Sequence, residues 1–296
     1  MTHYKLQGQS LPSKKPPAIS SPVLIEAWYE GVHYLVSHEP DGSRRLLSPL
    51  PATTAALLAP PIAFNRAYVK VTRSLSSALM LSHAVGEGNR LQDDSDGWFT
   101  KTTEEWHAET GLSRQEQITA RRVLKELGVM AEKLAGQPAR LHFRVDHARI
   151  YDLIHGTCDD QLSSEDLSAS MLMEMFGDVI AVNRAYIHLT GHVAAGVFLS
   201  FLQETIDSRL DTKAAGGFIM PLSELLRRTG LSMFELCSAR KMLAEMGFAT
   251  DHPPETETDG HVWLLDSEQV ELALQERSAN ERMEIEEMAK LIGLLG

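Results

Sequence analysis

Basic and amide side chains gather on one side of a predicted helix. Arg114 and Gln115 stand at its start, and Ile118, Arg122 and Lys125 follow at spacings that place all five on one helical face. Arg donates two hydrogen bonds to a base edge, Gln donates one and accepts one, and cations farther along a helix pair with phosphates. The pattern favours binding to a nucleic acid. The alternative is a solvent-exposed helix face in a domain that serves only protein contacts.

Short-range signals around this helix predict two helices joined by a tight turn. Thr102 or Thr103 can cap a first helix, and Gly111 permits the left-handed turn that ends it. Ser113 then caps the second helix, which is expected to run to Leu127. This arrangement is a helix-turn-helix.

The sequence contains two copies of one domain. FNRAYVKVT at residues 64–72 recurs as VNRAYIHLT at residues 182–190, an offset of 118 residues. ARRVLKELG at residues 120–128 likewise recurs as ARKMLAEMG at residues 239–247. We refer to the two domains as the first copy and the second copy.

Each copy is predicted to continue into a β-hairpin after its helices. The expected strands cover 129–133 and 140–145 in the first copy, and 248–250 and 261–265 in the second. Helices followed by a two-stranded wing form a winged helix. The tip of its hairpin can touch the DNA backbone beside the groove that the second helix enters.

The expected fold class is mainly α with small β wings (α+β). In chain order we expect a disordered arm at 1–22, a small β-meander and linker at 23–60, a winged-helix domain at 61–155, an acidic linker at 156–180, a second winged-helix domain at 181–266 and an acidic helix at 267–296. The meander is too small to stand alone, so it should pack on the helical body or pair across a dimer. The C-terminal helix should dock on the body, form a dimer seam or mimic DNA charge.

The stretch GWFTKTTEEWHAETGLSRQEQITARRVLKELGVM resembles the winged-helix modules of phage, plasmid and integrative-element replication and regulatory proteins. The shared pattern is aromatic-Lys-Thr, Glu-Glu-Trp, Gly-Leu-Ser-Arg and Ala-Arg-x-x-Leu-x-x-Leu-Gly. It covers residues 63–150 well and residues 181–274 more weakly. In architecture alone, two winged helices in one chain also resemble plasmid replication initiators. The resemblance implies binding to double-stranded DNA.

The first copy supplies the main expected DNA contacts. They are Lys101, Arg114, Gln115, Ile118, Arg121, Arg122, Lys125, and in the hairpin Lys133, Arg140 and Arg144. Lys101 is included because a cation at the start of the preceding helix is well placed for a phosphate.

The second copy differs at the matching helix positions. Met233, Phe234 and Cys237 make its face mostly apolar, which suits a homodimer or a protein partner better than DNA. A second interpretation is that Phe234 packs against the connecting segment or the meander. Three arginines remain as candidate contacts to the DNA backbone: Arg227, Arg228 and Arg240.

Charge is unevenly distributed along the chain. The net charge of −12 would oppose DNA binding if it were spread evenly. Residues 251–296 hold twelve acidic residues against three basic ones, whereas residues 97–149 hold nine basic and seven acidic residues. The sequence therefore predicts a basic face in the first copy and an acidic tail.

Composition restricts the remaining function classes. The 296 residues are 43% hydrophobic and 23% charged, which suits a globular protein with two domains. We expect a cytoplasmic bacterial protein without a membrane span, because no apolar run reaches about 18 residues. Cys158 and Cys237 should be ordinary thiols, and Asp93 with its acidic neighbours Asp94 and Asp96 a solvated insertion rather than a cation site. No enzyme, metal or cofactor is expected.

These features together predict sequence-specific binding of double-stranded DNA. The protein would act as a transcriptional regulator or as a replication initiator of a mobile genetic element. The alternative function is a non-catalytic adaptor or inhibitor that uses winged-helix surfaces to hold proteins.

Overall fold

The structure is a computed structural model that describes residues 23–29, 32–39, 41–90, 96–155, 179–208, 217–253 and 260–295. The chain forms two compact units, one within Met1–Leu50 and Met283–Gly296 and the other at Pro51–Arg282. Helices are combined with small antiparallel sheets. The expected disordered arm and nearly all of the acidic linker, with Cys158, Asp93 and Asp94, lie outside the described residues.

The smaller unit is built on the predicted meander. Its strands form one antiparallel sheet in the order β1-β2-β3: β1 (Val23–Tyr29), β2 (Val32–His38) and β3 (Arg44–Ser48). Tyr34, Val36 and Leu46 bury their side chains with Ala289 from the last helix. Arg44 donates a 3.0 Å hydrogen bond to the Leu294 carbonyl. The chain's own C-terminal residues therefore cover the apolar face of the meander.

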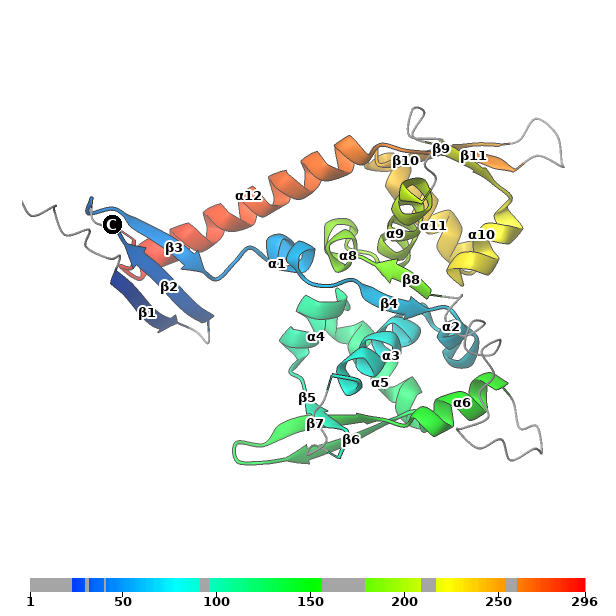
Figure 1. Cartoon of the computed structure of the whole chain (residues 1–296), viewed down its shortest axis with the longest axis horizontal. Coiled ribbons are helices and arrows are strands. Elements are labelled where there is room, and N and C mark those ends of the chain that lie inside the picture. Colours follow the sequence, from blue (N-terminus) through cyan, green and yellow to red (C-terminus); the bar gives the residue numbers. More distant parts are fainter. Residues whose placement is uncertain are drawn as a thin grey trace, which may run out of the picture. The chain divides into compact units, whose positions relative to one another are not determined.

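The first copy combines helices with a three-stranded sheet of order β5-β7-β6 (Figure 1). Its elements are β4 (Ile62–Asn65), α2 (Ala67–Thr72), α3 (Leu75–Gly88), β5 (Trp98–Thr100), α4 (Thr103–Thr110), α5 (Arg114–Glu126), β6 (Met130–Ala135), β7 (Arg140–Val145) and α6 (His147–His155).

The second copy repeats this order, and its sheet has the order β10-β11-β9. Its elements are β8 (Val179–Val182), α8 (Arg184–Thr190), α9 (Val193–Asp207), β9 (Gly217–Met220), α10 (Leu222–Thr229), α11 (Met233–Glu245), β10 (Ala249–His252) and β11 (His261–Leu265). Strand β8 begins inside the expected acidic linker.

The predicted helix-turn-helix and hairpins are confirmed at the level of their elements. Thr102 caps α4 and Ser113 caps α5, and each hydroxyl accepts a hydrogen bond from the third backbone amide of its helix. Gly111 ends α4 with a φ of +73°, a left-handed conformation that glycine adopts without strain. Two features were not predicted: β5 as a third strand of the sheet, and the break between α2 and α3 at Arg73.

The predicted connection before the first copy contains a helix, α1 (Ala52–Leu58). Thr53 is buried in it, and the Glu281 carboxylate accepts hydrogen bonds from its amide and hydroxyl at 2.8 and 2.9 Å. Glu281 belongs to α12 (Ser267–Leu291), the predicted C-terminal helix, whose Val270 is buried. This contact between distant segments explains why the linker prediction missed α1.

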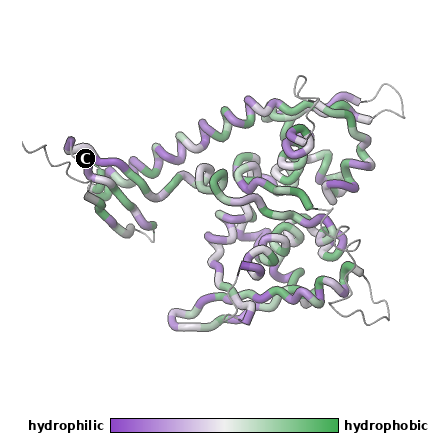
Figure 2. The backbone as a smooth tube through the Cα atoms, in the orientation of Figure 1, coloured by the Kyte–Doolittle hydropathy of each residue, from purple (hydrophilic) through white to green (hydrophobic). Residues whose placement is uncertain are grey.

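The two copies are related by an internal two-fold axis. Strands β4 and β8 lie side by side and antiparallel, and Ala63 faces Ala181, the residue that occupies the same position of the repeat. Both strands are hydrophobic over most of their length in Figure 2. An antiparallel pair in which equivalent residues face each other has two-fold symmetry, as in an isologous dimer interface. The single chain therefore contains a pseudo-dimer.

Side-chain contacts across this axis are reciprocal. A Cβ atom added to Gly111 would lie 2.4 Å from the Ile187 side chain, and one added to Gly230 would lie 3.3 Å from the Val69 side chain. Gly230 and Val69 are the repeat equivalents of Gly111 and Ile187. Buried residues of both copies form one continuous hydrophobic core.

Within the described ranges, no helix is both long enough and apolar enough to cross a membrane.

Candidate nucleic-acid interface

Helix α5 presents its predicted face to solvent. The side chains on this face are exposed: Arg114, Gln115, Ile118, Arg122 and Lys125. The opposite face is buried through Gln117, Ala120 and Leu124. Helical periodicity therefore separates core residues from residues that can meet a ligand.

Arg122 remains available although it has a partner. Its guanidinium lies 3.1 Å from the Glu126 carboxylate, and the two side chains are 63% and 62% exposed. An ion pair this exposed contributes little stability, so a phosphate could replace Glu126 at low cost.

Arg121 has a different role from the one predicted. Its Nε and Nη2 donate hydrogen bonds of 2.6 and 2.9 Å to the carboxylate of Glu132 in β6, and its guanidinium lies 5.5 Å from the centre of the Phe143 ring. The side chain is only 26% exposed. The structure thus assigns Arg121 to the link between α5 and the hairpin, which corrects its placement among the DNA contacts.

The second copy contains the same link. Arg240 donates hydrogen bonds of 3.1 and 2.7 Å to Asp251 in β10, and its guanidinium lies 5.5 Å from the centre of the Trp263 ring. Arg240 is therefore held like Arg121, and the suggestion that it contacts the DNA backbone is corrected as well.

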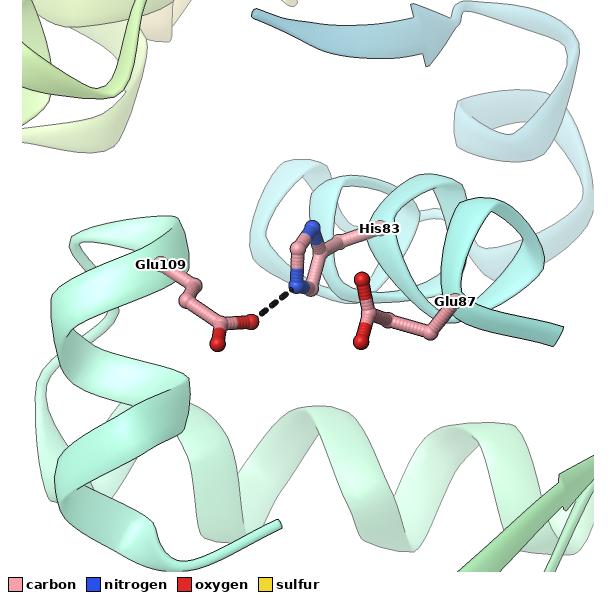
Figure 3. Close-up of side chains that lie close together, drawn as sticks. All are labelled: His83, Glu87 and Glu109. Carbon is pink, nitrogen blue, oxygen red and sulfur yellow. Dashed lines mark hydrogen bonds and ion pairs between the residues drawn. The ribbon is translucent and has the colours of Figure 1, made fainter. Parts of the chain in front are cut away.

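Lys101 is the third correction. Its ammonium lies 2.9 Å from the Glu87 carboxylate and 2.5 Å from that of Glu109, and its side chain is 7% exposed. Figure 3 shows His83 of α3 and Glu109 of α4 pointing toward each other, joined by a 2.5 Å hydrogen bond. A lysine held in this way cannot contact a phosphate on the surface.

The carboxylate of Glu109 is strongly stabilised in its charged form. Burial alone would raise its pKa, but hydrogen bonds from His83 and Lys101 and the charge of Lys101 lower it to about 2.

The same residues resemble a cation site. Ligand atoms of His83, Glu87 and Glu109 lie within 4.8 Å of one another. Lys101 pairs with both carboxylates and Arg90 pairs with Glu87, so cations of the chain itself already hold these carboxylates.

The hairpin cations lie on the outer face of the three-stranded sheet. Alternation along the strands buries Phe99 and Phe143 on the inner face and places Trp98, Lys133 and Arg144 on the other. The Lys133 ammonium lies 3.9 Å and the Arg144 guanidinium 5.0 Å from the centre of the Trp98 ring.

Trp98 is a candidate site residue that the sequence reasoning missed. The signal was present, since Trp98 directly precedes the inward-facing Phe99 in a short strand. Arg140 lies on the same outer face, next to the hairpin turn, and is exposed.

The matching face of the second copy is apolar and open to solvent. Phe234 is 84% exposed and Met233 is 50% exposed, and Cys237 is exposed too. The connecting segment of the second interpretation lies outside the described residues, so packing of Phe234 against it or against the meander stays a prediction. On the second sheet, Ile219 is 61% exposed where the first copy has Thr100.

No protein-family model matches this chain, and no curated protein matches it either.

Proposed function

We propose that both copies are winged-helix domains and that the first copy binds double-stranded DNA in a sequence-specific manner. The protein would regulate transcription or initiate replication of a mobile genetic element. The observation that carries the proposal is the open face of α5, whose two arginines, lysine and glutamine are exposed while Arg121 fixes the helix to the hairpin.

In the proposed complex, α5 enters the major groove. Arg114 and Gln115 at its start meet base edges, and Arg122 and Lys125 meet phosphates. Arg140 contacts the backbone from the hairpin. The Trp98 ring contacts the side chains of Lys133 and Arg144 and restricts their motion. Their charged groups therefore lose less conformational entropy when they bind DNA.

The proposal is tested by selecting bound fragments from randomised duplex DNA at near-physiological salt. We expect one enriched sequence, which Arg122→Ala binds about three- to tenfold more weakly because a phosphate contact is lost.

Lys241→Ala is the matched control. Lys241 occupies the same position on α11 and lies 3.8 Å from Glu245, as Arg122 pairs with Glu126 on α5. DNA affinity should be unchanged in this variant. No enrichment, or equal losses in both variants, would refute the proposal.

A second candidate function is favoured by the open apolar face of the second copy. The exposed Phe234 and Met233 suit a protein interface, and Glu235 beside them is acidic. On this alternative the protein is an adaptor or inhibitor, and its basic α5 face has no DNA ligand.

A further inference from the structure

A cavity of about 280 Å³ lies at the seam between the two copies. The first copy contributes Arg66, and the second contributes Arg227 and Arg228 from the last turn of α10. Its volume is slightly below the range of roughly 300–1,000 Å³ that small-molecule sites occupy, so it suits a small ligand. Three guanidinium groups in one small cavity favour an anionic ligand.

The arginines are held by other contacts of the fold. Arg66 donates a hydrogen bond through Nη1 to the Arg227 carbonyl oxygen. The Arg228 guanidinium lies 5.0 Å from the centre of the Phe201 ring. Burial, and next the charge of Arg227, lower the pKa of Arg66, whereas the charge of Glu224 raises it.

Two carboxylates near the cavity are already engaged. Glu224 accepts hydrogen bonds of 2.7 and 2.6 Å from Arg227, and Glu204 accepts a 3.3 Å hydrogen bond from the Ala181 amide. Among the described residues that line the cavity, three are arginines and one, Glu204, carries a carboxylate.

A buried hydroxyl also lines the cavity. Thr205 is 4% exposed, and its Oγ1 has no hydrogen-bond partner among the described residues. A buried polar atom without a partner is costly unless a ligand or water satisfies it.

The equivalent place in the first copy is filled by its own charges. Glu87 stands there at the position of Thr205, and Glu109 at the position of Arg228. Lys101 pairs with both of these glutamates, and Arg90 also pairs with Glu87. At these two positions the second copy has a hydroxyl and a guanidinium where the first copy has two carboxylates, so an anionic ligand suits the cavity of the second copy better.

We propose that this cavity binds the phosphate group of a small molecule, with Arg66, Arg228 and the Thr205 hydroxyl as donors. The ligand is either inorganic phosphate or a small phosphate ester, because both offer the same oxygens. Its contacts come from both copies, so the site exists only where the internal two-fold seam is formed. The proposal does not depend on DNA binding.

Isothermal titration of the full-length protein with inorganic phosphate, and separately with adenosine monophosphate, at constant ionic strength tests this site. We expect saturable binding of one ligand per chain by at least one of the two. Arg228→Gln should weaken it about tenfold or more, because a charge-assisted hydrogen bond is lost. Stronger binding of the monophosphate would identify the ester as the ligand, and equal binding would identify the phosphate alone.

Two further variants make the test specific. Thr205→Val keeps the shape of the side chain and removes the hydroxyl, so it should weaken binding while the thermal unfolding curve stays cooperative. Lys241→Gln removes an exposed cation from the same copy and should leave phosphate affinity unchanged.

Three results would overturn the proposal. They are the absence of saturable binding by either ligand, equal affinities of Arg228→Gln and Lys241→Gln, and binding of duplex DNA alone that Arg228→Gln weakens. The last result would make the cavity a DNA backbone contact instead.

Discussion

Arg121 and Arg122 are neighbours in sequence and have opposite roles. Rotation by one helical residue turns Arg121 toward Glu132 and leaves Arg122 in solvent, with exposures of 26% and 63%. The repeat carried a signal for this difference, because Arg and an acidic residue recur eleven positions apart in both copies. Arg121 is therefore a poor probe of DNA binding, since its loss would also loosen the hairpin.

Glu109 gives a prediction about pH. Its pKa of about 2 is below the ordinary 4.5, so its stabilising effect is complete above pH 4.5 and is lost as the pH falls toward 2. Glu109→Gln should lower the free energy of unfolding at pH 7 by at most about 3 kcal/mol, and the difference from wild type should shrink below pH 4.5. Urea unfolding at pH 7, 5 and 3 measures this.

Glu126→Gln is the control for Glu109, because the Glu126 side chain is 62% exposed. Its unfolding free energy should stay within about 0.5 kcal/mol of wild type. A constant difference between Glu109→Gln and wild type at all three pH values would contradict the assignment.

At the scale of elements, the turn between α4 and α5 also serves the seam between the copies. Gly111→Ala should destabilise the protein by about 2–4 kcal/mol, because a left-handed alanine is strained and its Cβ would meet Ile187 at 2.4 Å. Chemical denaturation monitored by circular dichroism measures the loss.

Gly128→Ala separates these two causes. Gly128 has a φ of +74°, close to the +73° of Gly111, but the nearest atom to an added Cβ lies 3.9 Å away. Gly128→Ala should lower the free energy of unfolding only by the cost of a left-handed alanine backbone, about 1–2 kcal/mol. Equal losses at the two glycines would show that the contact with Ile187 contributes nothing.

Helix α11 carries the prediction for the second copy. If its open apolar face joins two chains, Phe234→Asp should convert dimers to monomers, because a carboxylate cannot be buried there without a partner. Sedimentation velocity over a range of concentrations measures the change, and DNA binding per chain should persist. If Phe234→Asp assembles as the wild type does, the apolar face of α11 is not the dimer interface.

At the scale of the whole molecule, a net charge of −12 and a basic first copy combine in one chain. DNA binding should therefore depend strongly on salt. If about five phosphates are neutralised, the logarithm of affinity should fall with the logarithm of salt concentration with a slope of about −4.5. Fluorescence anisotropy of a labelled duplex between low and physiological salt gives the slope, and a slope near zero would favour the adaptor function.

The internal two-fold axis changes how a DNA site should be interpreted. A single chain has the symmetry of a dimer, but on the helix face its second copy has Met233 and Ala244 where the first has Arg114 and Lys125, and it keeps a cation only at Lys241. One chain should therefore contact one half-site, and a palindromic site would indicate that two chains bind.

Local signals in the sequence determined many of the elements. The meander strands, the caps at Thr102 and Ser113, and the left-handed turn at Gly111 all follow from interactions between residues close in the chain, and the structure confirms them. The internal repeat also predicted that the two copies have the same order of helices and strands, because similar sequences fold in similar ways.

Only the tertiary structure decided which charged residues are free. Lys101 and Arg121 look like surface cations in the sequence, yet carboxylates on other helices and strands of the first copy hold them. Burial and ion pairing depend on residues that the fold brings together, and sequence spacing does not record those distances. For the same reason the sequence does not predict the cavity lined by Arg66 and Arg228, since it forms only where the two copies pair through β4 and β8.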